Sequence, residues 1–319
     1  MDSVEAKETN EKETNESLES NIPSTSSGKA SNSTTKSDYE CNNSAVGKLG
    51  AFLEVPKVLN IIKTKFRWTY KVECGRGTNQ FYVSGSKSII KHMDSKGILL
   101  DEIATESRNI PRCFTVSRDG HLMYSDTVDR SINVVNDGKV KCIAKVGVWK
   151  PQSICSTSSG ELLVALKADD VDEAKVVRFS SSKVTQEVQF DSNGQPLYSD
   201  PHYIDENKNL DIVVSDFDAK VVVVVDKIGS FRFTYKGNPS DKTSDVFCPR
   251  GLTSDSMCHI LVADFENNLI HVIDQDGQFL RLIQNCGLHL PLDLSTNSDN
   301  ILFVVEYYSN RVKEIQYLK

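Results

Sequence analysis

An internal repeat marked by proline is the feature that most constrains what this chain can fold into. Five of its nine prolines open similar segments, and successive openings lie 40, 50, 48 and 42 residues apart, a mean of 45. These repeat heads are Pro111-Arg-Cys-Phe, Pro151-Gln-Ser-Ile, Pro201-His-Tyr-Ile, Pro249-Arg-Gly-Leu and Pro291-Leu-Asp-Leu. An acidic residue stands 15 positions after four of the heads, and an aliphatic residue follows six positions later. Offsets kept in register over four segments indicate a repeat array.

Two segments fit the repeat less well. The segment headed by Pro151 has Leu166 at the position where the others have an acid. One more repeat can be placed ahead of Pro111, with Thr69 in the proline position and Ser84 in the acid position. Counting these two gives six repeats in the chain.

Each repeat is predicted to form short β-strands. The runs are ILVAD (260–264), DIVVSD (211–216), HLMYSD (121–126), LIHVID (269–274), KVVVVVD (220–226), FLRLI (279–283) and FRFTY (231–235). Runs of this length, rich in β-branched residues and separated by Gly, Asn and Asp, are typical of strands, and helical spacing is absent. A four-stranded unit of about 45 residues is typical of one propeller blade, so the chain is predicted to be an all-β, six-bladed β-propeller.

The two ends of the repeat array indicate where the ring closes. After Glu306 the chain runs through RVKEIQYLK (311–319) and stops at Lys319, so the sixth blade is expected to lack its outer strand. We expect residues 54–66 to supply that strand, since this removes an exposed sheet edge, and we place the propeller at 50–319. Residues 1–49 are polar and rich in Ser and Thr, with one aromatic residue, Tyr39, and are predicted to be a disordered tail.

Composition excludes several classes of protein. No apolar run approaches the roughly 18–20 residues of a membrane span, and the start of the chain has neither the basic nor the apolar region of a signal peptide. The eight cysteines include no C-x-x-C pair, which excludes zinc modules of the RING and B-box types. We expect reduced thiols and a cytoplasmic location.

The repeats resemble NHL repeats. The resemblance rests on Pro249-Arg-Gly-Leu, on the strands ending at Asp264 and Asp274, and on Gly277, with a second good match running from Pro201 to Gly229. Residues 54–319 as a whole resemble the propeller of tripartite-motif (TRIM) proteins of the NHL class, notably the expanded invertebrate, bivalve-like sets, which implies an NHL/TolB-like fold. Those proteins carry RING, B-box and coiled-coil segments ahead of the propeller. This chain has only the polar tail there, so the resemblance does not bring ubiquitin-ligase activity with it.

Two sets of residues in the repeats stand out. The acids Asp126, Asp216, Asp264 and Glu306 end a strand before a tight turn, and we interpret them as structural groups that accept N–H bonds. The residues around the repeat heads are predicted to converge on one mouth of the central channel. This rim comprises Arg112, Trp149, Lys150, Gln152, His202, Tyr203, Phe247 and Arg250. Its cations and aromatic rings suit a peptide partner or stacked single-stranded RNA bases.

Enzyme interpretations were weighed against this pattern. Some six-bladed propellers, including lactonases and an NHL-like lyase, hold calcium or zinc in the channel. Zinc needs about three convergent ligands, and only His202 and His289 lie near repeat heads. The inner-strand acids Asp119, Asp255 and Asp293 fall at different offsets from their prolines, which does not favour calcium. We therefore expect no metal, no other cofactor and no catalytic residue, with a channel-metal enzyme as the weaker alternative.

The sequence thus predicts a non-enzymatic recognition scaffold. It would bind a protein partner through one propeller face, as in substrate recognition in a ubiquitin-ligase pathway. RNA binding in post-transcriptional regulation is the alternative, although a net charge of −7 weighs against it. We expect a monomer that does not associate with membranes.

Overall fold

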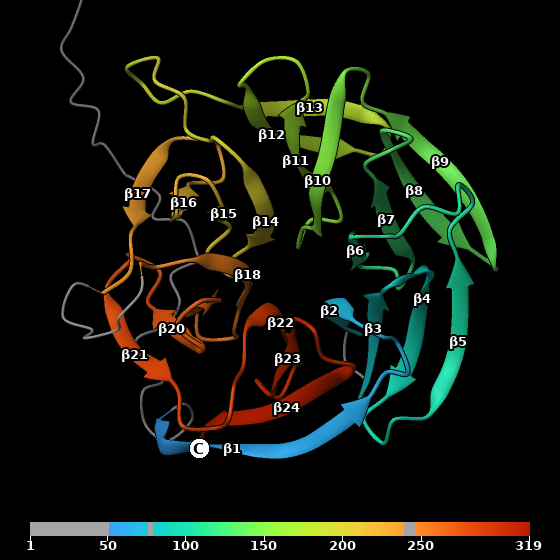
Figure 1. Ribbon diagram of the computed structural model, residues 1–319. Coiled ribbons are helices and arrows are strands. Elements are labelled where there is room, and N and C mark those ends of the chain that lie inside the picture. The colour runs from blue at the N-terminus through green and yellow to red at the C-terminus, as the bar shows by residue number, and fades with distance from the viewer. Residues whose placement is uncertain (1–50, 76–78, 239–245) are drawn as a thin grey trace, which may run out of the picture. The chain divides into compact units, whose positions relative to one another are not determined.

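The computed structural model describes residues 51–75, 79–238 and 246–319, and these form strands and turns without a helix. Twenty-four strands make six antiparallel four-stranded sheets, which are arranged as blades around a central axis (Figure 1). The prediction of an all-β, six-bladed β-propeller is confirmed. The predicted tail at 1–49 lies outside the described residues. In the described ranges, no helix has the length and apolar character that crossing a membrane requires.

The blades follow one another along the chain, and each runs from the inner strand outward. The first three sheets are β2 (Thr69–Cys74), β3 (Gln80–Gly85), β4 (Lys87–Asp94) and β5 (Leu99–Ala104); β6 (Cys113–Val116), β7 (Leu122–Asp126), β8 (Ser131–Asn136) and β9 (Lys139–Lys145); and β10 (Trp149–Ser156), β11 (Leu162–Ala168), β12 (Ala174–Ser180) and β13 (Lys183–Val188). The next two are β14 (Pro201–Glu206), β15 (Ile212–Asp216), β16 (Val221–Val225) and β17 (Phe231–Tyr235); and β18 (Pro249–Ser254), β19 (Ile260–Asp264), β20 (Leu269–Ile273) and β21 (Phe279–Ile283).

The sixth sheet is built from both ends of the propeller. It contains β22 (Pro291–Thr296), β23 (Leu302–Glu306), β24 (Arg311–Leu318) and the outer strand β1 (Phe52–Lys63). Strand β1 pairs antiparallel with β24, from Phe52 opposite Leu318 to Lys63 opposite Arg311. The closing strand therefore begins two residues before the expected range of 54–66 and ends three residues before its end.

Apolar side chains of neighbouring blades fill the space between them. Between the fourth and fifth blades, Val213 and Val222 pack with Leu252 and Ile260, and three of the four are completely buried. Each such side chain contributes about 1.5–3 kcal/mol when it leaves water. Among the described residues, six cysteines carry free thiols, namely Cys74, Cys113, Cys142, Cys155, Cys248 and Cys286.

A β-bulge follows the head of five inner strands. In four of these strands the head proline pairs with the residue in the acid position, as Pro201 does with Asp216 and Pro249 does with Asp264, whereas Thr69 in β2 pairs with Gly85, one residue further on. The register then shifts directly after the head in β2, β10, β14, β18 and β22. A bulge re-aims the side chain that it carries. The residue after each head is therefore set apart from the regular alternation of its strand, and this residue lines the channel.

Candidate functional site

The inner strands enclose a cavity at the end of the channel where these strands begin. We call it the upper cavity; its volume is about 330 Å³. Its wall contains the residue after the head from all six repeats, namely Tyr70, Arg112, Gln152, His202, Arg250 and Leu292. Cys113, Tyr203, Phe265 and Tyr307 complete the lining. One position of the repeat thus supplies most of the wall.

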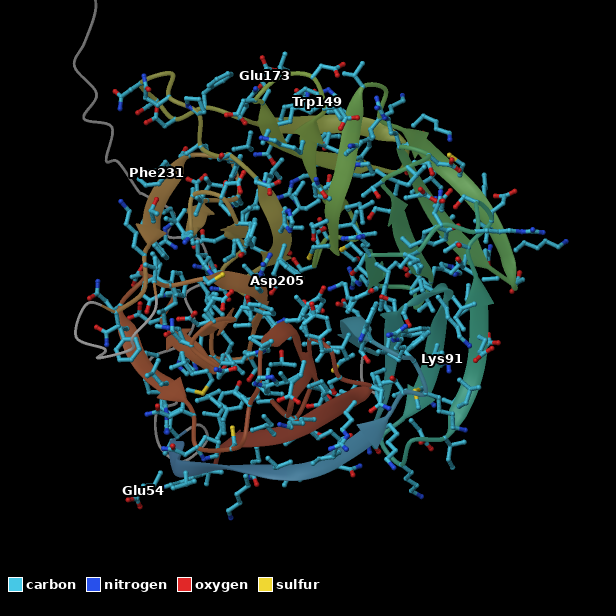
Figure 2. The ribbon with its side chains drawn as sticks, in the orientation of Figure 1. Glu54, Lys91, Trp149, Glu173, Asp205 and Phe231 are labelled. Atoms are coloured by element: carbon cyan, nitrogen blue, oxygen red, sulfur yellow. The ribbon has the colours of Figure 1, made fainter. Side chains whose placement is uncertain are left out.

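The structure brings together five of the eight predicted rim residues. Arg112, Gln152, His202, Tyr203 and Arg250 line the upper cavity. Trp149 lies away from the channel centre, whereas Asp205 lies near it (Figure 2). The Lys175 ammonium lies 4.5 Å from the centroid of the Trp149 ring. Lys150 forms an ion pair with Asp169. Phe247 is buried against Tyr235 and His271. These three side chains have partners away from the channel, within their own blade for Trp149 and Lys150 and between the fourth and fifth blades for Phe247.

Sequence reasoning missed five residues of the lining. Tyr70 and Leu292 share the offset of the predicted rim residues, so the repeat register alone could have identified them. Phe265 and Tyr307 each follow directly after a turn acid, a position where the fourth blade also carries an aromatic residue, Phe217. The fifth, Cys113, is buried below the mouth. The aromatic residue after the acid was a usable signal.

His202 and Asp200 form a histidine–carboxylate pair in the wall of the upper cavity. The distance from His202 Nε2 to Asp200 Oδ2 is 2.9 Å. The Asp200 backbone N–H donates to the turn acid Asp216, which also accepts from the Ser199 N–H at 2.6 Å. Burial opposes ionisation of Asp200, but the hydrogen bond and charge of His202, with the charges of Lys167 and Arg250, lower its pKa overall. The carboxylate therefore stays ionised and orients the imidazole.

Two guanidinium groups give the upper cavity its positive charge. The Arg250 guanidinium lies 3.8 Å from the Phe217 ring centroid and 5.0 Å from that of Phe265. Within the described part of the chain, its buried Nε has no hydrogen-bond partner. Arg112 is exposed at the mouth, and no carboxylate belongs to the cavity lining. An unsatisfied buried donor is costly, so this wall favours a ligand that offers an oxygen acceptor or a negative charge.

Below the upper cavity lies a layer of side chains that contains Lys71 and Asp293, which we call the middle layer. Lys71 Nζ lies 3.4 Å from Asp293 Oδ2 and 3.6 Å from Glu73 Oε2. The Lys71 side chain is only 10% exposed and that of Asp293 1% exposed. Burial lowers the pKa of Lys71, but the negative charge of Asp293 and of further groups outweighs this effect. The pKa of Lys71 is therefore raised well above its ordinary value. The lysine is therefore charged in the folded protein.

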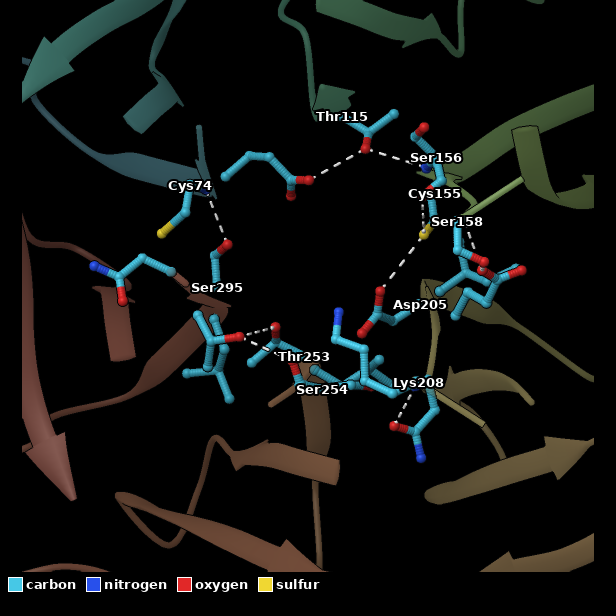
Figure 3. A pocket seen from close by; sticks show the side chains of 18 of the residues that line it. Cys74, Thr115, Cys155, Ser156, Ser158, Asp205, Lys208, Thr253, Ser254 and Ser295 are labelled. Carbon is cyan, nitrogen blue, oxygen red and sulfur yellow. Dashed lines mark hydrogen bonds between the residues drawn. The ribbon is translucent and has the colours of Figure 1, made fainter. Parts of the chain in front are cut away.

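A polar cavity of about 350 Å³ lies beyond this layer, where the inner strands end (Figure 3). We call it the lower cavity. Thr115 Oγ1 donates to Glu73 Oε1 at 3.2 Å, and Cys155 Sγ donates to Asp205 Oδ1 at 3.5 Å. Burial raises the pKa of both carboxyl groups, against the opposing effect of Lys71 on Glu73. Burial also raises the pKa of the Cys155 thiol, which makes it a poor nucleophile.

The four predicted turn acids are all buried. Asp126 accepts the N–H groups of Val128 and Asp129, and Asp216 accepts that of Ala219. Asp264 accepts the N–H of Cys248, and Glu306 that of His289. None of the four lines the upper or the lower cavity. Their contacts join the turn after the second strand to the segment that precedes the repeat head, and so they position the channel wall.

The donor atoms around the channel do not fit a divalent metal ion. The upper cavity has two guanidinium groups and no carboxylate in its lining. In the middle layer, an ammonium group already stands beside Asp293 and Glu73. Among the residues that the structure describes, no three His, Cys, Asp or Glu side chains are grouped so that they could hold a metal.

No family model and no curated protein matches the sequence, and the chain is similar to known proteins in structure alone. A putative gluconolactonase aligns with a TM-score of 0.64 and 13% identity, over 85% of this chain and 99% of that one. A streptogramin B lyase gives 0.60 and 11%, over 83% and 98%. The virginiamycin B lyase of Staphylococcus aureus gives 0.59 and 11%, over 82% and 99%. At these identities the likeness establishes the propeller fold and does not extend to the tripartite-motif family.

These neighbours contradict the prediction of a non-enzymatic recognition scaffold, and with it the prediction that the chain is not an enzyme. The propellers that the chain resembles carry the names of lyases and of a lactonase. Of the three predicted rim cations, Arg112 and Arg250 share the upper cavity, whereas Lys150 lies outside it and pairs with Asp169.

Proposed function

We propose that this propeller is a lactonase- or lyase-like enzyme with its active site in the upper cavity. The observation that carries the proposal is the 2.9 Å contact between His202 and Asp200 in a wall that also holds Arg112 and Arg250. A histidine oriented by a carboxylate is a general base that works near neutral pH. Guanidinium groups beside it can stabilise the negative charge that develops on a carbonyl oxygen.

The proposed chemistry begins with proton removal by His202. Its Nε2–H donates to Asp200, so Nδ1 carries the lone pair that accepts the proton. In a hydrolysis the proton comes from water, the resulting hydroxide attacks the lactone carbonyl, and the acyl C–O bond breaks as the leaving ring oxygen takes the proton back from His202. In an elimination on a cyclic depsipeptide the proton comes from the carbon between an amide carbonyl and the carbon that bears the ester oxygen. The bond between that second carbon and the ester oxygen then breaks and leaves a carboxylate and a double bond. Negative charge develops on the lactone carbonyl oxygen in the first route and on the amide carbonyl oxygen in the second, and Arg112 and Arg250 act on it.

The named neighbours support this proposal by analogy of fold. One of them is a catalytically inactive histidine-to-alanine variant of the Staphylococcus aureus virginiamycin B lyase with quinupristin, at 13% identity and a TM-score of 0.58. A histidine that matters for catalysis in a propeller of this shape agrees with the role given to His202. The NHL-like character of the repeats is a separate proposal, and it rests on the Pro249 and Pro201 segments of the sequence.

The proposal is tested with the purified chain and a panel of five- and six-membered lactones and cyclic depsipeptides. Ring opening is followed by acid release, and the products are analysed by mass spectrometry. A mass gain of one water identifies hydrolysis, whereas an unchanged mass with a new double bond identifies elimination. Acid release no faster than in the buffer blank across the panel, with folded protein, would contradict the proposal.

Asp200→Asn separates orientation of the base from simple damage to the fold. The variant keeps the shape of the side chain but can no longer hold His202 in the same tautomer, so kcat should fall by about 10²-fold or more while KM stays nearly constant. The pH–rate profile should also shift. A variant with the wild-type profile would show that Asp200 does not act through His202.

A further inference from the structure

Lys71 occupies an unusual place for a lysine. It lies on the innermost strand of the first blade, in the layer between the two cavities, with a side chain that is 10% exposed. Its ammonium interacts with two carboxylates and lies 5.8 Å from the centroid of the Phe114 ring. A buried ammonium is expensive unless it is paired, so packing alone does not account for a lysine here.

The surroundings of Asp293 hold its carboxylate in position for this lysine. Asp293 Oδ2 also accepts the Val72 backbone N–H at 3.0 Å, which ties β22 to β2 across the junction of the last and first blades. The neighbouring inner strand has Gly251 at the point of contact, and a Cβ there would lie 2.4 Å from Asp293 Oδ1. The ion pair is therefore accommodated by three blades.

We infer that the Lys71 ammonium is the fixed cation of this channel and takes the place of a divalent metal ion between the two cavities. It supplies positive charge on the same oxygen atoms, Asp293 Oδ2 and Glu73 Oε2, that a calcium ion would need as ligands. The inference is independent of the proposed function, because it concerns charge balance in the folded channel. It predicts a protein that does not need a metal to fold or to keep its stability.

The test removes the cation and asks whether a metal ion replaces it. Wild-type protein and Lys71→Met are freed of metal with a chelator, and their thermal melting is measured in chelator and in about 10 mM CaCl₂. We expect the wild-type melting temperature to be the same in both. Lys71→Met should melt about 10 °C lower in chelator, because two buried carboxylates lose their partner. Calcium should then raise its melting temperature by about 3 °C.

Three further variants make the result specific. Lys71→Met/Asp293→Asn should lose the response to calcium, because one ligand is gone. Lys71→Arg keeps the charge and should stay insensitive to calcium. Lys208→Met, an exposed lysine of the lower cavity, is the matched control and should melt like the wild type in both buffers. Calorimetric titration with CaCl₂ should give one site, of about millimolar Kd, in Lys71→Met only.

Two outcomes would overturn the inference. The first is a wild-type protein that binds one equivalent of calcium, or that loses stability when it is chelated; this measurement does not depend on whether Lys71→Met folds. The second is a folded Lys71→Met protein whose melting temperature does not respond to calcium.

Discussion

The two cavities of the channel are built by the same six inner strands and yet have opposite chemistry. The upper cavity presents Arg112, Arg250 and the His202 imidazole and has no carboxylate in its lining. The lower cavity presents Glu73 and Asp205, both buried carboxyl groups with raised pKa values, beside the ammonium groups of Lys71 and Lys208. Lys71, at the border of the lower cavity, and Asp293 form the layer between the two cavities. The fold alone therefore does not decide what a propeller channel does.

The difference between the cavities follows from the position of each residue in its strand. In five of the six blades, the bulge after the head sets one residue into the upper cavity, free of the alternation that serves the core. Residues three to five positions after the head return to regular pairing and line the lower cavity. Side chains at the bulge can thus vary without disturbing the packing between blades, and we place the proposed catalytic chemistry there.

Substituting one residue in each cavity tests this division most directly. His202→Ala should lower kcat/KM by about 10²–10⁴-fold, the usual contribution of a general base. Glu73→Gln in the lower cavity should change it by no more than about a factor of two, since distant sites act independently. Steady-state kinetics on the substrate found in the lactone panel provide the measurement. A large loss in Glu73→Gln with His202→Ala unaffected would move the active site to the lower cavity.

The middle layer should be the most sensitive to added volume. Gly251→Ala places a Cβ 2.4 Å from both Cα and Oδ1 of Asp293, and the free energy of unfolding should fall by about 3 kcal/mol. Ser153→Ala in the same layer loses only the contact of its hydroxyl with Cys113 Sγ at 3.2 Å, at a cost of about 1 kcal/mol. Urea unfolding of both variants gives the comparison. Equal losses would mean that the close approach at Gly251 is not restrictive.

The guanidinium groups of the upper cavity should act on the developing negative charge and on substrate binding. Arg112→Gln and Arg250→Gln each remove a charged hydrogen-bond donor, so kcat should fall, KM should rise, and kcat/KM should fall by about 10–100-fold. Lys150→Gln is the matched control, because this predicted rim residue pairs with Asp169 outside the cavity and should leave KM unchanged. An equal rise in all three variants would indicate long-range charge attraction instead of contact, and dependence on salt would confirm it.

The repeat made much of the fold predictable from the sequence. The run ILVAD coincides with β19 at Ile260–Asp264, because a short, fully buried apolar run between turn residues specifies a strand locally. The site was harder to predict. Trp149 and Phe247 lie near repeat heads, as the lining residues do. Trp149 instead contacts the Lys175 ammonium, and Phe247 packs against His271, so neither side chain lines the cavity. Lys71 lies in the repeat without a head proline, and its partner Asp293 is 222 residues away. A local sequence pattern cannot predict a contact between residues so far apart in the chain.

The pH dependence of stability should distinguish the two cavities by sign, with the smallest effect of these tests. Because burial raises the pKa of Asp205, the folded state binds more protons than the unfolded state above the ordinary carboxyl range, and stability falls as pH rises through the folded pKa. Asp205→Asn should remove this slope and gain on the order of 1 kcal/mol at neutral pH. Asp200 has a lowered pKa, so Asp200→Asn should lose stability at neutral pH and match the wild type in acid. Urea unfolding across pH measures both slopes, and slopes of the same sign would contradict the assigned difference between the cavities.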